Sequence, residues 1–348
     1  MKGKTLGFLI GCTLLVMIAG LVGLAGPSGY HLIKTIKIGG EGGWDYLNVD
    51  SANRKLYVSH GNHVVVIDID KNEVVGDIPD TTGVHGIAIA NDLNRGFTSN
   101  GRGNSVTIFD LKTLKVIGTV AIKGQNPDAI AYDPFTKRVF TFNGRSHDVT
   151  AIDGATGEVV GTLDVGGKPE FAQSNGKGRM FVNIEDKDEV IAFDPKALTV
   201  IGHWPLAPGK GPSGMAIDIE HNLIFSGCGE TDLMVMTNTE TGKVVGSAPI
   251  GKGVDANAYD PGTKLAFSSN GQAGGTLTVV HVDSPTKFTV VENVPTHTGA
   301  RTMALDPKTH NVYLAIAEYG QAPPTPAGGR PQRAPMIPDS FSIQVYGK

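Results

Sequence analysis

Short runs of alternating apolar and polar residues fill the chain from about residue 30 to its C-terminus, and the same pattern returns seven times. One aromatic position stays in register through these repeats, at intervals of 40, 43, 41, 44, 42 and 46 residues. The aromatic residues are Tyr57, Phe97, Phe140, Phe181, Phe225, Phe267 and Tyr313. Alternation with a period of two is typical of β-strands. Each aromatic residue therefore marks one strand, which we call strand B of its repeat.

Three more strands are predicted in each repeat. Seven residues before most of the aromatic residues a turn begins at Asp50, Asp133, Asp218, Asp260 or Asp306. Asp caps such turns with its own side chain, and the small apolar residues before the turn predict an inner strand A. After strand B comes a third run, which ends in pairs such as Ile67-Asp68. A fourth run follows it, for example Val159-Val160-Gly161. These are strands C and D of a four-stranded antiparallel blade.

The ends of the chain predict how the ring of blades closes. The seventh repeat contains strands A and B within residues 302–316 and strand C at 341–346, but it has no strand D. Residues 32–38 resemble the strand D at 116–122 position for position. An N-terminal strand that completes the last blade leaves no open inner edge. We therefore predict an all-β fold, a seven-bladed β-propeller of four-stranded antiparallel blades that spans residues 30–348.

Two segments also resemble a known repeat. Tyr57-Val58-Ser59-His60 and Phe267-Ser268-Ser269-Asn270-Gly271 are similar to the YVTN-type repeat of YncE-like proteins of bacterial envelopes, and the resemblance covers about residues 30–348. It implies the propeller fold and an envelope location, and it implies no reaction. The chain departs from the repeat at Ile184-Glu185-Asp186 in blade 4 and at a Pro-rich insertion, residues 320–339, in blade 7. We interpret the insertion as a flexible surface loop, either without a role or acting as a lid or docking loop.

Residues 1–29 differ from the rest of the chain. Lys2 and Lys4 precede an apolar run from residue 6 to about residue 25, and no acidic residue occurs there. This pattern predicts an export signal, cleaved near Gly23-Leu24-Ala25. The run is long enough that residues 5–25 form the alternative, a retained membrane anchor. Either way we expect an exported protein, in the periplasm or at the cell surface.

Composition excludes several classes of function. Beyond the signal only Cys228 remains, so no disulfide forms within the mature chain. With 34 acidic against 30 basic residues, the chain repels nucleic acid rather than binding it. It lacks the C-x-x-C-H, H-E-x-x-H, G-x-S-x-G and P-loop motifs. We therefore expect no covalent haem, no nucleotide site and no cofactor other than a possible divalent metal ion.

One equivalent position predicts a ligand-binding ring. In a propeller the D-to-A and B-to-C loops surround one mouth of the axial channel, which we call the upper mouth. Five residues before each strand-A turn the repeats carry Asp45, His85, Asp128, Glu170, Ser213, Asp255 and Arg301, which we call the axial ring. Crowded carboxylates raise one another's pKa, and a nearby cation lowers it. We expect at least one raised pKa, and a lowered one in the carboxylate nearest Arg301.

A second set belongs to the B-to-C loops and is predicted to form a rim around the same mouth. Its members are His60, Asn100, Arg102, Asn143, Arg145, Cys228 and Asn270. Arg102 and Arg145 either bind an anionic ligand or are simply exposed. We expect His60, His63 and His147 to be solvated loop residues, and Cys228 to be an inert thiol rather than a nucleophile.

The sequence leaves two functions open. The first is a non-enzymatic scaffold that presents its polar axial face to a small ligand or an envelope protein. The second is a metal-dependent hydrolase or lactonase with Asp45, Asp128, Glu170 and Asp255 as metal ligands. His85 would then be a ligand or general base, and Arg301 would stabilise the oxyanion. Asp45, His85 and Asp128 are the candidates for a mixed nitrogen and oxygen metal site, although a water-filled polar channel accounts for them equally well.

Overall fold

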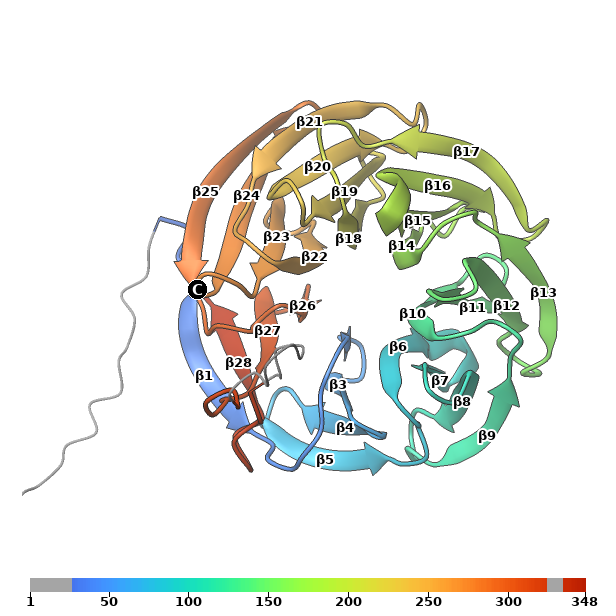
Figure 1. Cartoon of the computed structure of the whole chain (residues 1–348), viewed down its shortest axis with the longest axis horizontal. Helices are drawn as coiled ribbons and strands as arrows, with labels where there is room; N and C mark the ends of the chain where they lie inside the picture. Colours follow the sequence, from blue (N-terminus) through green and yellow to red (C-terminus); the bar gives the residue numbers. More distant parts are fainter. Residues whose placement is uncertain (1–26, 324–333) are drawn as a thin grey trace, which may run out of the picture.

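The structure is a computed structural model that describes residues 27–323 and 334–348. Seven four-stranded antiparallel sheets stand around a central axis (Figure 1). The predicted seven-bladed β-propeller is thereby confirmed. In the described ranges there is no α-helix, only the 3₁₀ turns η1 (Asn91–Leu93) and η2 (Glu185–Lys187), and no helix that could cross a membrane. The predicted export signal lies almost wholly in residues 1–26, outside the described residues.

Blades 1 to 6 each use four consecutive strands, with strand A innermost and strand D outermost (Figure 1). Blades 1 to 3 consist of β2 (Leu47–Asp50), β3 (Lys55–His60), β4 (His63–Asp68), β5 (Glu73–Ile78); β6 (Val84–Ala90), β7 (Arg95–Asn100), β8 (Ser105–Asp110), β9 (Val116–Ala121); β10 (Pro127–Asp133), β11 (Arg138–Asn143), β12 (Asp148–Asp153) and β13 (Val159–Asp164). Blades 4 to 6 consist of β14 (Pro169–Ser174), β15 (Met180–Ile184), β16 (Glu189–Asp194), β17 (Thr199–Pro205); β18 (Pro212–Asp218), β19 (Leu223–Cys228), β20 (Leu233–Asn238), β21 (Val244–Pro249); β22 (Val254–Asp260), β23 (Leu265–Asn270), β24 (Thr276–Ser284) and β25 (Lys287–Pro295).

Blade 7 is built from both ends of the chain. Its strand order is β1-β28-β27-β26, with bounds β26 (Met303–Asp306), β27 (Asn311–Ile316), β28 (Ser342–Gly347) and β1 (His31–Lys37). The pairing of β1 with β28 is antiparallel and runs from His31 opposite Gly347 to Lys37 opposite Ser342. Just before β1, the Tyr30 hydroxyl donates to the carbonyl oxygen of His310 at 2.8 Å. The N-terminal strand therefore closes the ring, as the sequence predicts.

The aromatic residues of strand B form the core between blades. All seven have at most 1% of their surface exposed. Phe140 of blade 3, for example, packs with Val182 and Phe193 of blade 4 in one apolar cluster, and its ring centroid is 5.8 Å from that of Phe193. The predicted register of strand B is therefore correct.

The Asp residues that open the strand-A turns also join neighbouring blades at the lower end of the channel. Asp133 of blade 3 accepts from the hydroxyl of Ser174 in blade 4 at 2.5 Å. Asp260 of blade 6 lies 2.7 Å from Nδ1 of His310 in blade 7. These carboxylates are fully buried, so each is satisfied by its own turn and by the next blade.

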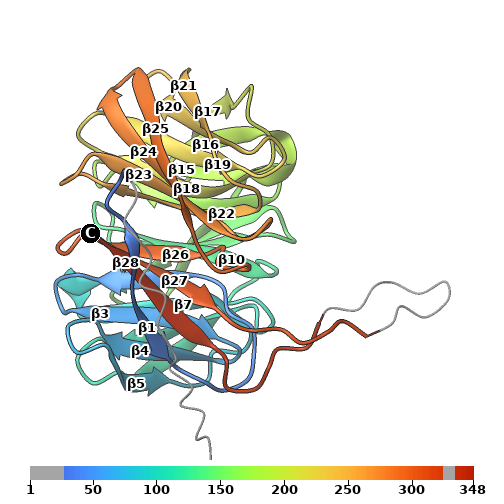
Figure 2. The same ribbon diagram turned by 90° about the vertical axis from the view of Figure 1, so that its left-hand side faces the viewer.

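The two ends of the Pro-rich insertion project side by side from one face of the propeller, and we call them its limbs (Figure 2). Tyr319 and Met336 form an isolated bridge between the limbs, and Gly320 N donates to Pro335 O at 2.9 Å. Residues 324–333 lie outside the described residues. The predicted lid or docking role of this loop stays a prediction.

Candidate functional site

The axial ring converges at the upper mouth of the channel. Five members are the second residue of strand A, and Asp45 and Arg301 lie two residues before its start, where the chain turns from the D-to-A loop toward the axis. Six of the seven members form an unbroken series of contacts that runs from blade 3 through blades 2, 1, 7 and 6 to blade 5. In order, the series is Asp128, His85, Asp45, Arg301, Asp255 and Ser213.

A histidine between two carboxylates forms one half of this series. Nδ1 of His85 lies 2.6 Å from Asp45 Oδ2 and 3.5 Å from Asp128 Oδ1. Burial lowers the pKa of His85, but the hydrogen bond to Asp45 and the charge of Asp128 outweigh it, so the pKa is raised overall. The imidazole Nδ1 of His85 therefore points toward the carboxylates of both Asp45 and Asp128.

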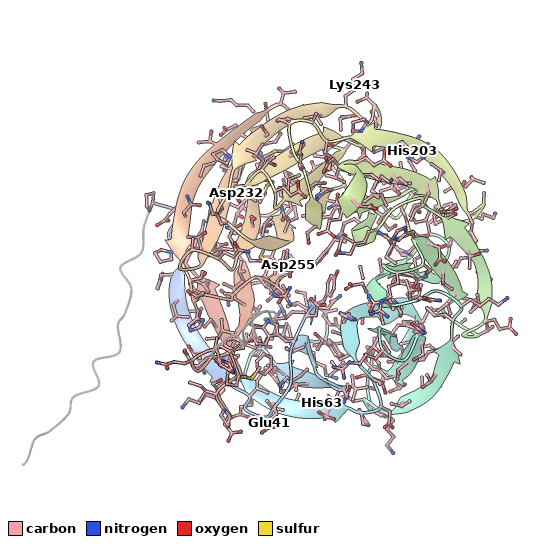
Figure 3. All side chains as sticks on the ribbon, viewed as in Figure 1. Glu41, His63, His203, Asp232, Lys243 and Asp255 are labelled. Carbon is pink, nitrogen blue, oxygen red and sulfur yellow. The ribbon has the colours of Figure 1, made fainter. Side chains whose placement is uncertain are left out.

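Arg301 carries the series across the seam between blades 7 and 1. Its guanidinium pairs with Asp255 and has Nη2 3.9 Å from Asp45 Oδ1. Asp255 also accepts a hydrogen bond from the Ser213 hydroxyl at 3.0 Å. In Figure 3 Asp255 lies beside the central opening. One arginine thus partly neutralises two carboxylates from different blades.

Glu170 is the one member outside the series, and its partners were not predicted. Lys168 Nζ lies 2.6 Å from Glu170 Oε1 and also pairs with Glu185. Glu185 begins the 3₁₀ turn η2, where blade 4 departs from the repeat. The sequence signal for these partners was that departure, together with a lysine two residues before the ring position.

Asp128, Glu170 and Asp255 of the ring have raised pKa values. Burial, and then the charge of Asp45, raises the pKa of Asp128 to about 6. Burial and the charge of Asp128 raise the pKa of Glu170 to about 8 despite Lys168, which is shared with Glu185. A raised carboxylate pKa is therefore confirmed.

The expected lowering nearest Arg301 is wrong. Burial raises the pKa of Asp255 to about 6 although Arg301 lowers it. The guanidinium is 46% exposed, so water weakens its effect, whereas the carboxylate lies within the channel mouth. Desolvation therefore exceeds the ion pair.

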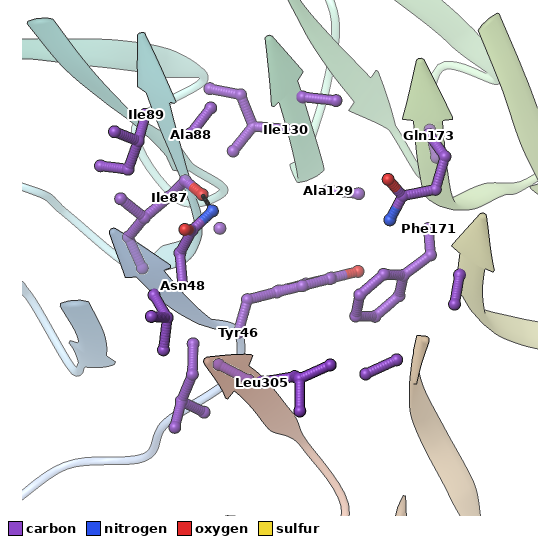
Figure 4. A pocket seen from close by; sticks show the side chains of 18 of the residues that line it. Tyr46, Asn48, Ile87, Ala88, Ile89, Ala129, Ile130, Phe171, Gln173 and Leu305 are labelled. Carbon is purple, nitrogen blue, oxygen red and sulfur yellow. Dashed lines mark hydrogen bonds between the residues drawn. The ribbon is translucent and has the colours of Figure 1, made fainter. Parts of the chain in front are cut away.

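An aromatic pair lies below the ring. Tyr46 reaches across the channel toward Phe171 (Figure 4), and their ring centroids are 4.4 Å apart. They come from blades 1 and 4, on opposite sides of the axis. Below them the channel continues as a cavity of about 490 Å³ lined mainly by small and aliphatic residues such as Ile87, Ala129 and Leu305.

This pair was missed, although the repeat alignment contained a signal for it. The position that follows the ring carries Gly, Ala or Thr in five blades and an aromatic residue only in blades 1 and 4. Aromatic side chains at opposite points of a narrow channel must meet across it.

The three asparagines of the predicted rim are not exposed. Asn100, Asn143 and Asn270 are buried and tie strand B to strand C. Asn143, for example, accepts from the Thr141 hydroxyl at 3.0 Å and donates to Thr150 Oγ1 at 3.0 Å. Their amides satisfy the interior of the blade, and their predicted part in ligand binding stays a prediction.

The other rim residues divide into two groups. His60 and Cys228 are buried; the His60 ring stacks on Phe341 with centroids 4.3 Å apart, so the expectation of a solvated His60 is wrong. Burial raises the pKa of the Cys228 thiol to about 12, which fits an inert residue. Arg102 and Arg145 are exposed, as expected.

The ring also contains a geometry that suits a metal ion. One potential ligand atom from each of Asp45, His85 and Asp128 lies within 4.8 Å of the other two. Two carboxylate oxygens and an imidazole nitrogen fit zinc or manganese. For His85 to ligate through Nδ1 it would have to give up its bond to Asp45.

Comparisons with known proteins agree with the architecture. No protein-family profile matches the chain, and no curated protein matches its sequence. Its structure is similar to a chain of the mitotic checkpoint complex, with a TM-score of 0.72 and 14% identity over 100% of this chain and 99% of that one. It is also similar to U3-55K, with a TM-score of 0.73 and 10% identity over 90% and 98% of the two chains. The WD40 repeats of RRP9 give a TM-score of 0.74 and 10% identity over 90% and 97%. At such low identities the likeness shows the β-propeller fold.

Proposed function

We propose that this protein is an exported, YVTN-type propeller that acts as a non-enzymatic binding scaffold and receives a positively charged ligand at the axial ring. The observation that carries the proposal is the set of crowded, partly buried carboxylates at the upper mouth. Counting Glu185, five carboxylates are paired, within the described residues, with Lys168, Arg301 and His85 alone. A cationic ligand relieves this excess of negative charge.

The raised pKa values support the same ligand class. Asp128 and Asp255, with pKa values of about 6, and Glu170, with a pKa of about 8, take up protons at moderate pH because they are buried and lie beside other carboxylates. A bound cation competes with those protons, so its affinity rises with pH. An anionic ligand would meet repulsion at the same place.

The export and subfamily assignments rest on the sequence. The basic and apolar segment before residue 30 supports export, and the segments at Tyr57 and Phe267 support the YVTN type. One similar structure belongs to a complex, which is compatible with a binding role for this fold. A propeller supports many functions, so the ring chemistry carries the argument.

Thermal unfolding with a panel of ions tests the proposal. We expect at least one of calcium, manganese, zinc or diaminobutane to raise the Tm, and phosphate or citrate to leave it unchanged. Asp128→Asn and Asp255→Asn should remove the effect. Asp164→Asn is the matched control, because Asp164 is an exposed carboxylate at the end of β13 that leads into a D-to-A loop. No response to any cation, or an equal response in the ring variants, would contradict the proposal.

The triad Asp45, His85 and Asp128 favours a second candidate, the metal-dependent hydrolase or lactonase. A bound divalent ion would polarise a carbonyl or activate water, and Arg301 would lie beside the developing oxyanion. Metal analysis of the purified protein, with lactone and ester assays before and after chelation, separates the two. Chelator-sensitive turnover lost in His85→Ala would favour the enzyme over the scaffold.

A further inference from the structure

A side pocket adjoins the axial ring on the upper face. It has a volume of about 370 Å³ and shares Ser213 and Asp255 with the ring. Its other charged lining residues are Glu185, Asp186 and Glu230, and within the described ranges no Lys or Arg lines it. A pocket of this size accommodates a small molecule. Because they share Ser213 and Asp255, the ring and the pocket adjoin and their acidic side chains form one group.

The floor of the ring points to a ligand independently of the carboxylates. The hydroxyl of Tyr46 crosses the axis toward Phe171 (Figure 4) and has no hydrogen-bond partner among the described residues. An aromatic surface beside carboxylates is the environment that binds ammonium groups through cation–π attraction.

The shape of the channel decides the direction in which a ligand extends. Below Tyr46 and Phe171 the cavity lining includes the amide side chains of Asn48, Gln173 and Asn257, but no described Asp or Glu lines it. An ammonium group that entered it would therefore give up hydration without gaining a carboxylate partner. The side pocket offers carboxylates instead. A cation longer than the ring itself therefore extends sideways toward Glu230.

The protein already holds one ammonium group in this way. Lys168 Nζ lies 2.6 Å from Glu170 and pairs with Glu185 as well, so the wall between ring and pocket binds a primary ammonium through two carboxyl groups. The carboxylates of Asp186 and Glu230, which also line the pocket, are exposed and form no ion pair within the described part of the chain. Asp186 Oδ1 accepts a hydrogen bond from Lys168 N at 2.7 Å, so Glu230 is the carboxylate left to hold a second ammonium group.

We propose that the ring and the side pocket together bind a linear aliphatic diamine or polyamine, with one ammonium group above Tyr46 and Phe171 and the next beside Glu230. This inference rests on the proposed function and narrows its ligand to an organic cation with spaced primary ammonium groups. Free polyamines and the lysine side chains of a peptide share that chemistry. The small volume of the pocket favours the free amine.

Calorimetric titration tests the inference with four probes: diaminobutane, butylamine, butanediol and lysyl-lysine. We expect diaminobutane to bind ~10-fold or more tightly than butylamine because the second ammonium group binds intramolecularly, and butanediol not to bind. Glu230→Gln should remove most of the advantage of the diamine and leave butylamine unchanged. Asp164→Asn should change neither affinity.

Several outcomes would overturn the inference. Equal affinities for diaminobutane and butylamine, or an undiminished advantage in Glu230→Gln, would show that the side pocket takes no part. Binding of lysyl-lysine without diaminobutane would transfer the site to peptides. If calcium or zinc binds at the ring and no amine does, this inference fails while the proposed cation site stands; if no cation binds, both fail.

Discussion

Arg301 of blade 7 and Asp45 of blade 1 lie 3.9 Å apart, between guanidinium Nη2 and carboxylate Oδ1, across the seam where the ring closes. These residues become neighbours only because β1 completes blade 7. The candidate site and the closure of the propeller therefore depend on one another. A protein whose ring opened at this seam would lose the continuous series of axial-ring contacts.

Closure predicts a position-dependent effect in β1. Ile36 is 4% exposed and packs in the core cluster of blades 7 and 1, whereas Ile33 on the same strand is 45% exposed. Ile36→Asp should cost about 3 kcal/mol or more because it buries an unpaired charge. Ile33→Asp, the matched control, should cost less than about 0.5 kcal/mol. Urea unfolding monitored by tryptophan fluorescence measures both, and equal costs would show that β1 contributes no core.

The aromatic positions of strand B make a second prediction. Phe140→Ala should lower the free energy of unfolding by about 3–5 kcal/mol, because it leaves a cavity between blades. Phe135, which is 57% exposed in the turn before the same strand, is the control. Phe135→Ala should cost less than about 0.5 kcal/mol. Denaturation midpoints that fall equally in the two variants would refute the assigned packing.

Glu170 should make the unliganded protein less stable as pH rises. Its pKa in the folded protein, about 8, exceeds the ordinary value of 4.5. The folded state therefore holds the proton more tightly, and this contribution is complete below about pH 4.5 and is lost as pH rises through about 8. Glu170→Gln, which cannot ionise, should flatten this part of the curve of Tm against pH. An unchanged slope in the variant would place the titrating group elsewhere.

Cys228 should resist alkylation. Its side chain is fully buried in blade 5, and burial raises its pKa to about 12, so the reactive thiolate is scarce at neutral pH. Iodoacetamide at pH 7.5 should leave the folded protein unlabelled and label it after denaturation in urea, as mass spectrometry would detect. Rapid labelling of the folded protein would instead revive a nucleophilic role.

The repeat made the fold and the axial ring predictable, because equivalent positions in seven blades must be equivalent in space. Asp45 and Arg301 could be placed together without any local motif. Buried polar contacts were harder to predict. The sequence places Asn143 in the rim at a B-to-C loop, yet its buried amide joins strands B and C. The raised pKa of Asp255 was not predicted either. The sequence shows that Arg301 is near, but it does not show how far each side chain is desolvated on folding.

The last prediction concerns Arg54 of blade 1, which donates from Nη1 to Asp306 of blade 7 at 2.7 Å and from Nη2 to Asp70 at 2.9 Å. The carboxylate of Asp306 is fully buried and that of Asp70 is 59% exposed, so one guanidinium supplies an internal comparison. Asp306→Asn should cost about 3 kcal/mol, because the buried pair is broken across the seam. Asp70→Asn should cost less than about 1 kcal/mol, since water screens an exposed pair.

The pH dependence of this pair has the opposite sign to that of Glu170. Burial raises the pKa of Asp306, but hydrogen bonds from Ser51, Thr309 and Arg54 outweigh burial and lower it below its ordinary value. Its stabilising contribution is therefore present above the ordinary carboxylate pKa and is lost as pH falls through the lowered one. The difference in unfolding free energy between the parent and Asp306→Asn should shrink on acidification, whereas Asp70→Asn should show little change. A constant difference from pH 7 down to pH 3 would mean that Asp306 is not held ionised by its seam partners.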